Sequence, residues 1–219
     1  MDGLSTLDQD KGATMQGGNM RPQRPEERSI AGFHFTQRMG ALCEDIVDRC
    51  PDLAHIRMQQ VGVTWTQARK RTAHGLHAWL LPMRFRGGAL DGRIGRQRYT
   101  VQRMFGPLGH EYLYLLAFCL PRFLDLNFGE KLTTIFHELW HISPDFDGDL
   151  RRHPGRCYAH SSSQLAYDQQ MKQQARQWLD DHPPIALYDF LHLDFATLYR
   201  TQGRIGGVKL RRPKLIPID

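Results

Sequence analysis

The sequence predicts an α+β fold with an N-terminal helix, a small mixed or antiparallel sheet of about four strands, a helix that carries two histidines, and further C-terminal helices. Three observations support this prediction. Apolar residues recur at helical spacing over residues 35–49, they run through four short segments between residues 55 and 120, and helical spacing returns after residue 127. Because the strands form one group and most helices follow them, the order favours α+β over a repeated βαβ fold.

The N-terminal segment, residues 1–29, is predicted to be disordered, and the folded domain is predicted to span residues 30–219. Residues 1–29 carry few apolar side chains among Gly, Gln, Asp and Arg. Burial of so little apolar surface cannot offset the entropy that is lost on ordering. The domain is expected to open with a helix over residues 35–49 that begins at Thr36 or His34.

Four segments are expected to be strands, at residues 55–66, 75–85, 97–105 and 111–120. The last is an almost continuous apolar run, which is typical of a strand that is covered on both faces. The strand over residues 97–105 is one candidate for an exposed sheet edge that holds an extended peptide. Glycines between the second and third strands predict turns or a flexible loop, at positions 87, 88, 92 and 95.

A capped helix is predicted over residues 128–142. Asn127 is followed three residues later by Glu130, as in a capping box with Asn in place of Ser or Thr, and Pro144 prevents extension of the helix. The rest of the chain is expected to form a loop, two helices and a basic extended tail, at residues 145–156, 162–179, 185–199 and 203–219.

His137, Glu138 and His141 form the chemical motif of this helix. Histidines four residues apart lie on one face, one turn apart, where both imidazoles can bind one zinc ion. Glu138 lies about 100° around the helix from His137, which places it to reach a metal-bound water and not to ligate the metal. This is the HExxH arrangement of zinc peptidases, so the sequence predicts a zinc-dependent metallopeptidase with Glu138 as general base.

A third zinc ligand must come from elsewhere, because a catalytic zinc normally takes three protein ligands and one water. His160 and His153 are the nearest downstream histidines. We favour His160, which directly precedes a predicted helix start, over His153, which lies among arginines that would repel a dication. Cys157 is a further option. The aspartates at 145, 147 and 149 could also bind the metal or support its ligands, but their expected role is in turns.

The predicted reaction also needs a donor for the negative charge that develops on the carbonyl oxygen. In this mechanism Glu138 takes a proton from the attacking water and passes it to the leaving amine. Four side chains lie close enough in the sequence to donate to the oxyanion, and nothing in the sequence ranks them: Tyr158, Tyr167, Arg151 and Arg156.

Three stretches around the motif resemble the phage metallopeptidase family: residues 134–144, 146–152 and 155–160, which read TIFHELWHISP, FDGDLRR and GRCYAH. The similarity extends from about Gly75 to the C-terminal RPKLIP segment. The resemblance implies a zincin-like fold, a bound zinc ion and peptidase activity, with His137, Glu138 and His141 as the residues that carry over. Because the family is defined mainly by its HExxH motif, the resemblance implies no particular substrate.

The chain carries 29 Lys and Arg against 23 Asp and Glu, a formal net charge of +6. Basic clusters occur at residues 69–71, 93–103, 151–156 and 209–214. Such charge is usually a solvated surface, and its distribution along the chain argues against one designed patch; contact with nucleic acid or an acidic substrate is the functional interpretation. The alternatives to a peptidase are therefore a non-catalytic zincin-like binding module and a DNA-associated protein, although no nucleic-acid-binding motif supports the latter.

Cysteine usage and hydropathy favour a cytoplasmic protein. The four cysteines, at 43, 50, 119 and 157, form neither a CxxC pair nor a secreted disulfide pattern, and no signal peptide or membrane-spanning run is evident. Cys43 and Cys119 lie inside apolar runs and are expected in the core. The expected partner is a peptide or protein substrate, and no association with a membrane is expected. The sequence does not define the oligomeric state.

Overall fold

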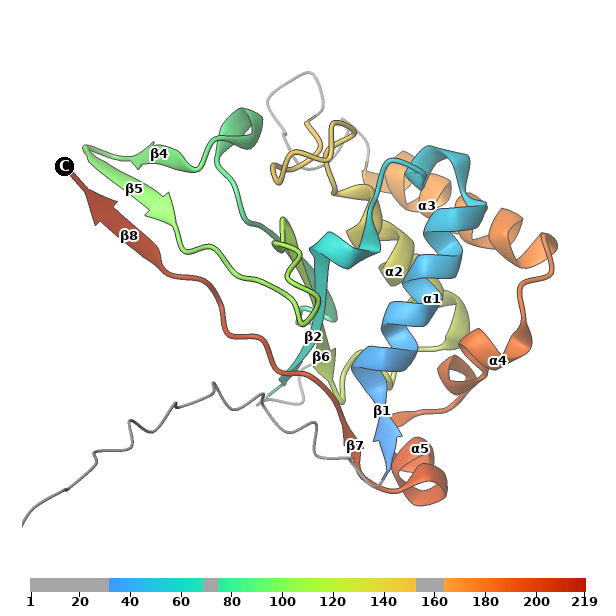
Figure 1. Cartoon of the computed structure of the whole chain (residues 1–219). Coiled ribbons are helices and arrows are strands. Elements are labelled where there is room, and N and C mark those ends of the chain that lie inside the picture. The colour runs from blue at the N-terminus through green and yellow to red at the C-terminus, as the bar shows by residue number, and fades with distance from the viewer. Residues whose placement is uncertain (1–31, 69–74, 153–163) are drawn as a thin grey trace, which may run out of the picture.

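The structure, a computed structural model, describes residues 32–68, 75–152 and 164–219. It is a mixed α and β protein in which helices cover one side of a small central sheet and a three-stranded arm extends from the other side (Figure 1). The N-terminal segment that is predicted to be disordered, residues 1–29, lies outside the described residues.

Helix α1 (Phe35–Arg49) has the bounds that the apolar spacing predicts. Of the two predicted starting residues, His34 is the N-cap, because its Nδ1 accepts a hydrogen bond from the backbone N–H of Gln37 at 3.2 Å. One face of this helix is buried against the central sheet, at Phe35, Met39, Leu42, Cys43, Ile46 and Val47.

The central sheet has three strands in the order β2 (Val61–Gln67), β6 (Tyr114–Leu120) and β3 (Ala78–Pro82). β2 runs parallel to β6, and β3 runs antiparallel to it. All seven residues of β6 are buried, which confirms the prediction of a strand that is covered on both faces. Among the described residues β3 pairs with β6 alone, and it contacts helix α2 (Phe128–Trp140), which carries the histidine motif.

The remaining long strands form a separate antiparallel sheet in the order β4 (Asp91–Ile94), β5 (Gln97–Val101) and β8 (Leu215–Ile218). The prediction of one sheet of about four strands is therefore wrong, because the strand expected over residues 97–105 pairs outside the central sheet. The region that was expected to be a glycine-rich loop contains strand β4. Gly95, with a φ of 63°, allows the two-residue turn that joins β4 to β5 in a hairpin. β4 is too short for its alternation to be recognised in the sequence.

The C-terminal segment returns across the domain before it enters the arm. β7 (Ile205–Gly206) pairs in parallel with β1 (Phe33–His34), beside the start of α1. The chain then runs in extended form past the sheet face that is turned away from the helices (Figure 1). Thr64 anchors this path, because its Oγ1 accepts a hydrogen bond from the backbone N–H of Leu210 at 2.9 Å.

Three α-helices follow α2 among the described residues: α3 (Gln164–Asp180), α4 (Ile185–Tyr188) and α5 (Phe195–Gln202). The prediction of one helix over residues 185–199 is wrong. Asp194 is the N-cap of a new helix and accepts a hydrogen bond from the N–H of Thr197 at 2.7 Å, while the buried Lys131 amine donates to the Leu191 carbonyl at 2.9 Å. Within the described ranges, no helix is both long and apolar enough to cross a membrane.

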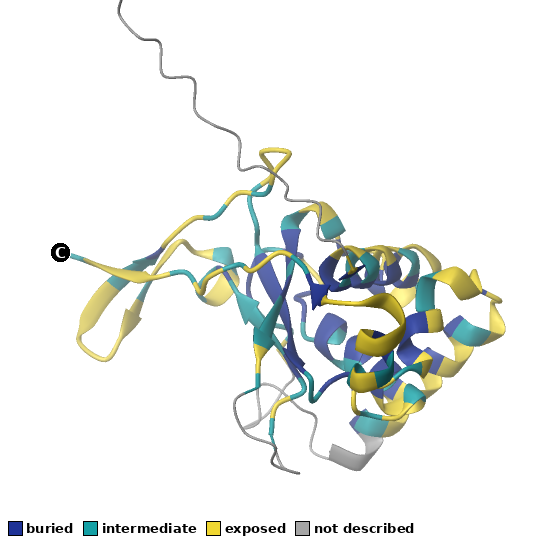
Figure 2. Cartoon of the chain, turned by 90° about the horizontal axis from the view of Figure 1, so that it is seen from below, coloured by how far each residue is buried: buried dark blue, intermediate teal, exposed yellow. Residues whose placement is uncertain are grey.

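The main core lies between the central sheet and the helices, where the buried residues concentrate (Figure 2). Aromatic contacts join the layers, since the ring centroid of Phe118 in β6 lies 4.7 Å from that of Phe123 and 5.7 Å from that of Phe35. Cys43 and Cys119 are buried, as the sequence predicts. A smaller cluster connects the sheet to the arm, with Met83, Val101 and Leu115 at its centre.

Candidate metal centre and its pocket

Helix α2 begins where the sequence predicts. The Asn127 side chain accepts a hydrogen bond from the backbone N–H of Glu130 at 2.9 Å, and the Glu130 carboxylate accepts one from the backbone N–H of Asn127 at 3.2 Å. This reciprocal pair is the predicted capping box, and it satisfies backbone donors that the first helical turn leaves open. The helix ends at Trp140, before the predicted end at residue 142.

His137 and His141 lie on one face of this helix, one turn apart. His137 is in the last turn, and His141 is the C-cap residue, whose φ of −67° and ψ of −16° keep it in a helical conformation. The centroids of the two imidazole rings are 4.6 Å apart, and their planes are inclined by 81°. Both residues are half-buried. Two imidazoles this close can each direct a nitrogen to a single metal ion, because zinc–nitrogen bonds are about 2.0–2.1 Å long.

Glu138 is buried where α2 contacts β3, with 8% of its surface exposed. The backbone N–H of Leu80 in β3 donates a hydrogen bond to its carboxyl group. Burial raises the pKa of Glu138 to about 7, and the Leu80 hydrogen bond acts in the opposite direction. The carboxyl group therefore lies next to His137 in a site with little water, where a nearby cation would favour its ionised form.

Tyr167 of α3 is the side chain that the tertiary structure adds to this motif. It is 2% exposed, and its ring centroid lies 4.9 Å from that of His137 and 6.1 Å from that of His141. Burial and the charge of Glu138 raise the pKa of Tyr167 above its ordinary value. The phenol therefore stays protonated at neutral pH and is able to donate a hydrogen bond.

Of the four predicted oxyanion donors, Tyr167 and Arg151 are among the described residues. Arg151 is held beside Trp140, because its Nε donates to the Trp140 carbonyl at 2.7 Å and its guanidinium lies 4.0 Å from the centroid of the Trp140 ring. Tyr158 and Arg156 lie outside the described residues. Of these two residues, Tyr167 is the one whose ring lies against both histidines.

The spacing of apolar residues in α3 is a sequence signal for the inward position of this tyrosine. Tyr167, Met171, Ala175 and Trp178 are spaced at three or four residues and are all buried. Such spacing marks the inward face of a helix. It predicts that Tyr167 points into the domain, but it does not predict which helix the ring meets.

The favoured third ligand and both alternatives lie outside the described residues: His160, His153 and Cys157. Among the described residues, no group of three His, Cys, Asp or Glu side chains is arranged to hold a metal ion. The described chain on either side of residues 153–163 contacts the histidine pair. The backbone N–H of Arg151 donates to the His141 carbonyl at 2.8 Å, and Tyr167 lies against both imidazole rings.

Two of the three aspartates in the loop after α2, Asp147 and Asp149, bond to backbone N–H groups within this loop, as expected for turns. Asp149 accepts hydrogen bonds from the backbone N–H groups of Gly87 at 3.0 Å and Leu150 at 2.8 Å, and it pairs with Arg152 at 2.9 Å. The Asp147 carboxylate accepts a hydrogen bond from the backbone N–H of Asp149 at 3.0 Å. These carboxylates are used to hold the loop and its neighbours.

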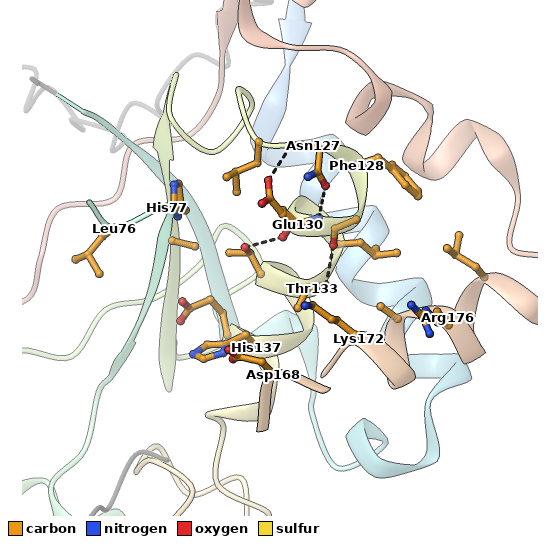
Figure 3. A pocket seen from close by; sticks show the side chains of 18 of the residues that line it. Leu76, His77, Asn127, Phe128, Glu130, Thr133, His137, Asp168, Lys172 and Arg176 are labelled. Atoms are coloured by element: carbon orange, nitrogen blue, oxygen red, sulfur yellow. Dashed lines mark hydrogen bonds between the residues drawn. The ribbon is translucent and has the colours of Figure 1, made fainter. Parts of the chain in front are cut away.

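A pocket of about 850 Å³ opens beside His137 and Glu138, between α2, α3 and the segment that precedes β3 (Figure 3). Figure 3 shows His137 and Asp168 at one end, with Lys172 and Arg176 farther along α3. Much of the remaining wall is apolar, with contributions from Leu76, Leu126, Leu132, Ala175 and Leu179. A pocket of this size, apolar with a few charged groups, is typical of a ligand-binding site.

β3, and not the strand predicted over residues 97–105, is the sheet edge next to the histidines. β5 lies between β4 and β8 in the arm, so both of its edges are paired. In β3, by contrast, the Leu80 N–H bonds to Glu138 and not to another strand. The interpretation of residues 97–105 as a peptide-binding edge is therefore wrong, because strand pairing depends on residues far apart in the sequence.

Comparisons of this chain with protein-family models, with curated proteins and with solved structures found no match. The resemblance to phage metallopeptidases therefore stays an expectation from the sequence. What this site can do has to be derived from its geometry.

Proposed function

We propose that this protein is a zinc-dependent metallopeptidase with a zincin-like fold. The observation that carries this proposal is the pair of imidazole rings with centroids 4.6 Å apart, next to the buried carboxyl group of Glu138 and the edge strand β3. A capped helix with two histidines on one face and an acid beside them supplies the parts that an HExxH site needs.

His137 and His141 would hold the zinc ion together with His160, or with His153 in its place. Imidazole nitrogen is a preferred ligand of Zn²⁺, and both rings are half-buried. When bound, the ion lowers the pKa of a water molecule and polarises the scissile carbonyl group.

Glu138 is the general base in this proposal. It accepts a proton from the attacking water and delivers it to the leaving amine. Contact with β3 and the hydrogen bond from Leu80 hold the carboxyl group in place. Tyr167 donates a hydrogen bond to the carbonyl oxygen as negative charge develops on it, which its protonated phenol allows.

The substrate would be an extended peptide that adds to the edge of β3 with which no described strand pairs. Strand addition uses backbone hydrogen bonds for affinity, and adjacent pockets select side chains. A side chain next to the scissile bond would enter the pocket of about 850 Å³ beside Glu138. The apolar wall favours an apolar side chain, while Lys172 and Arg176 would attract a negative charge at the far end of the pocket.

The substitution Glu138→Gln tests this function, because glutamine keeps the shape of the side chain but cannot act as a base. We expect the variant to retain about one zinc ion per chain by elemental analysis. We expect its hydrolysis of an unfolded protein and of a fluorogenic peptide library to fall by at least ~100-fold. Glu44→Gln on the exposed face of α1 is the matched control and should cleave like the wild type.

Two outcomes would contradict the proposal. Hydrolysis at the wild-type rate by Glu138→Gln would exclude Glu138 as the base. A wild-type protein that binds zinc but cleaves none of these substrates, with four protein ligands on the metal, would favour the non-catalytic binding module, because structural zinc sites are closed by four protein ligands.

A further inference from the structure

The sheet of β4, β5 and β8, with the chain that connects it to the domain, forms a basic arm that consists of residues 84–111 and 207–219. The arm extends from the side of the central sheet that is opposite the helices (Figures 1 and 2). It contains ten Lys and Arg against three Asp and Glu, an excess of seven positive charges. The rest of the chain has nineteen Lys and Arg against twenty Asp and Glu, so the net charge of +6 arises in the arm.

Strand pairing concentrates this charge. β5 pairs with β8 in antiparallel register, with Val101 opposite Leu215. Next to this pair, the backbone N–H of Gln102 donates to the Lys214 carbonyl at 2.9 Å. Two basic segments that are far apart in the sequence therefore lie side by side. The positive charges are spread along the sequence, but they are close together in the folded chain.

Two arginines of the arm lie directly opposite each other on neighbouring strands. Arg93 of β4 is the cross-strand partner of Arg98 of β5. Like charges in this position destabilise a sheet. Arg98 has only weak and exposed partners: its Nη1 donates to the main-chain oxygen of Asp219 at 3.4 Å, and its Nη2 lies 4.0 Å from the half-exposed carboxylate of Asp91. Glu111 is engaged by two other arginines at the base of the arm. An anionic partner would offset the repulsion that these exposed contacts compensate only in part.

Two further cations of the arm lie against indole rings of the outer strands of the central sheet, β2 and β3. Lys209 Nζ lies 4.1 Å from the centroid of the Trp65 ring, and the Arg212 guanidinium lies 4.4 Å from that of Trp79. These contacts hold the cations in place on β2 and β3. They also cover the two indole rings, which are then not free to stack on bases as the aromatic residues of single-strand-binding proteins are.

We propose that the basic arm binds double-stranded DNA through its phosphates, without reading the sequence. Duplex DNA is a stiff polyanion with one negative charge per about 1.7 Å of axis, which matches cations that are held on a folded sheet. The contact surface runs from Arg96, at the turn between β4 and β5, to Lys209 on the central sheet. Exposed Ile94 and Ile216 on the same arm make an anionic membrane the competing partner.

Fluorescence anisotropy of a labelled duplex of about 20 base pairs, titrated at several salt concentrations, tests this proposal. Wild-type protein should bind, and its affinity should fall steeply with salt. The triple variant Arg93→Gln, Arg96→Gln and Arg98→Gln should lose about 2–3 from the magnitude of the slope of log K against log salt. Its affinity should be roughly 10- to 100-fold weaker at about 100 mM salt.

The matched control removes the same charge from outside the arm, by Arg49→Gln, Arg57→Gln and Arg200→Gln, all exposed. It should keep the wild-type slope. Lysine in place of the three arginines of the arm should restore binding, because phosphate contacts without sequence readout need charge and not the guanidinium shape.

Three results would overturn the proposal. The first is a wild-type protein that does not bind the duplex at about 50 mM salt. The second is an equal loss of affinity in the control variant. The third is binding to vesicles of phosphatidylcholine and phosphatidylglycerol without binding to DNA. None of these measurements uses catalysis, so the proposal stands or falls independently of the peptidase function.

Discussion

The ring of Tyr167 stands edge to face against the ring of His137, at a centroid distance of 4.9 Å and an interplanar angle of 86°. The two residues belong to α3 and α2, which pack against each other. This contact ties the position of the histidine pair to a helix outside the HExxH motif. The ring and the hydroxyl of Tyr167 can therefore be tested separately.

Tyr167→Phe should keep the fold and the zinc content, because phenylalanine retains the ring that contacts His137. We expect kcat for peptide hydrolysis to fall by roughly 10- to 100-fold with little change in KM, as for the loss of one donor to the transition state. Tyr199→Phe, at an exposed position in α5, is the control and should be unaffected. Loss of zinc from Tyr167→Phe, or an unchanged kcat, would assign the hydroxyl a purely structural role.

His137→Ala and His141→Ala should each reduce the zinc content from about one ion per chain to near zero, because each removes one of three ligands. Since the metal binds only the folded protein, chelation should lower the Tm of the wild type and leave the Tm of these variants unchanged. Elemental analysis and thermal scans with and without a chelator measure both effects. His110→Ala, at an exposed site, should behave as the wild type does.

Two alanine variants distinguish between the candidates for the third zinc ligand. His160→Ala should lose zinc, whereas His153→Ala should retain it, because a ligand next to a helix start is held more rigidly than one in a loop among arginines. Zinc retained by His160→Ala and lost by His153→Ala would reverse the assignment. Zinc retained by both would direct attention to Cys157, which Cys157→Ser then tests.

Glu111 joins two segments of the chain at the base of the arm. Its carboxylate accepts hydrogen bonds from Arg103 Nε at 2.8 Å and from Arg84 Nη2 at 2.8 Å. These bonds hold the pKa of Glu111 below its ordinary value, and the bond from Arg103 has the larger effect. Because the folded pKa is below the unfolded one, the stabilisation is present above the ordinary Glu pKa of about 4.3 and is lost as pH falls through the folded pKa.

Glu111→Gln should therefore lower the free energy of unfolding by roughly 1–2 kcal/mol at neutral pH. The difference from the wild type should shrink toward zero as the solution is made acidic below the ordinary pKa. Urea denaturation at a series of pH values measures it. Asp91→Asn is the control, since an exposed pair at 4.0 Å should contribute less than ~0.5 kcal/mol. A difference that does not change with pH would contradict the assignment.

Local interactions made several elements predictable from the sequence. Asn127 and Glu130 are three residues apart, so their reciprocal hydrogen bonds need only the first turn of the helix that they start. The helix over Phe35–Arg49 was also predictable, because apolar residues at helical spacing indicate one buried face. Where a polar side chain interrupts a helix, as Asp194 does, the sequence is ambiguous, because the same residue is tolerated on an exposed helical face.

The sequence by itself determined the HExxH helix, the face that carries His137 and His141, and the acid beside them, because helical geometry relates residues only a few positions apart. Only the tertiary structure decided what surrounds that motif, namely the phenol of Tyr167 and strand β3, and only the tertiary structure concentrated the charge in the basic arm. These features depend on contacts between distant segments, and such contacts form when the whole core is buried and not through the preferences of any one segment.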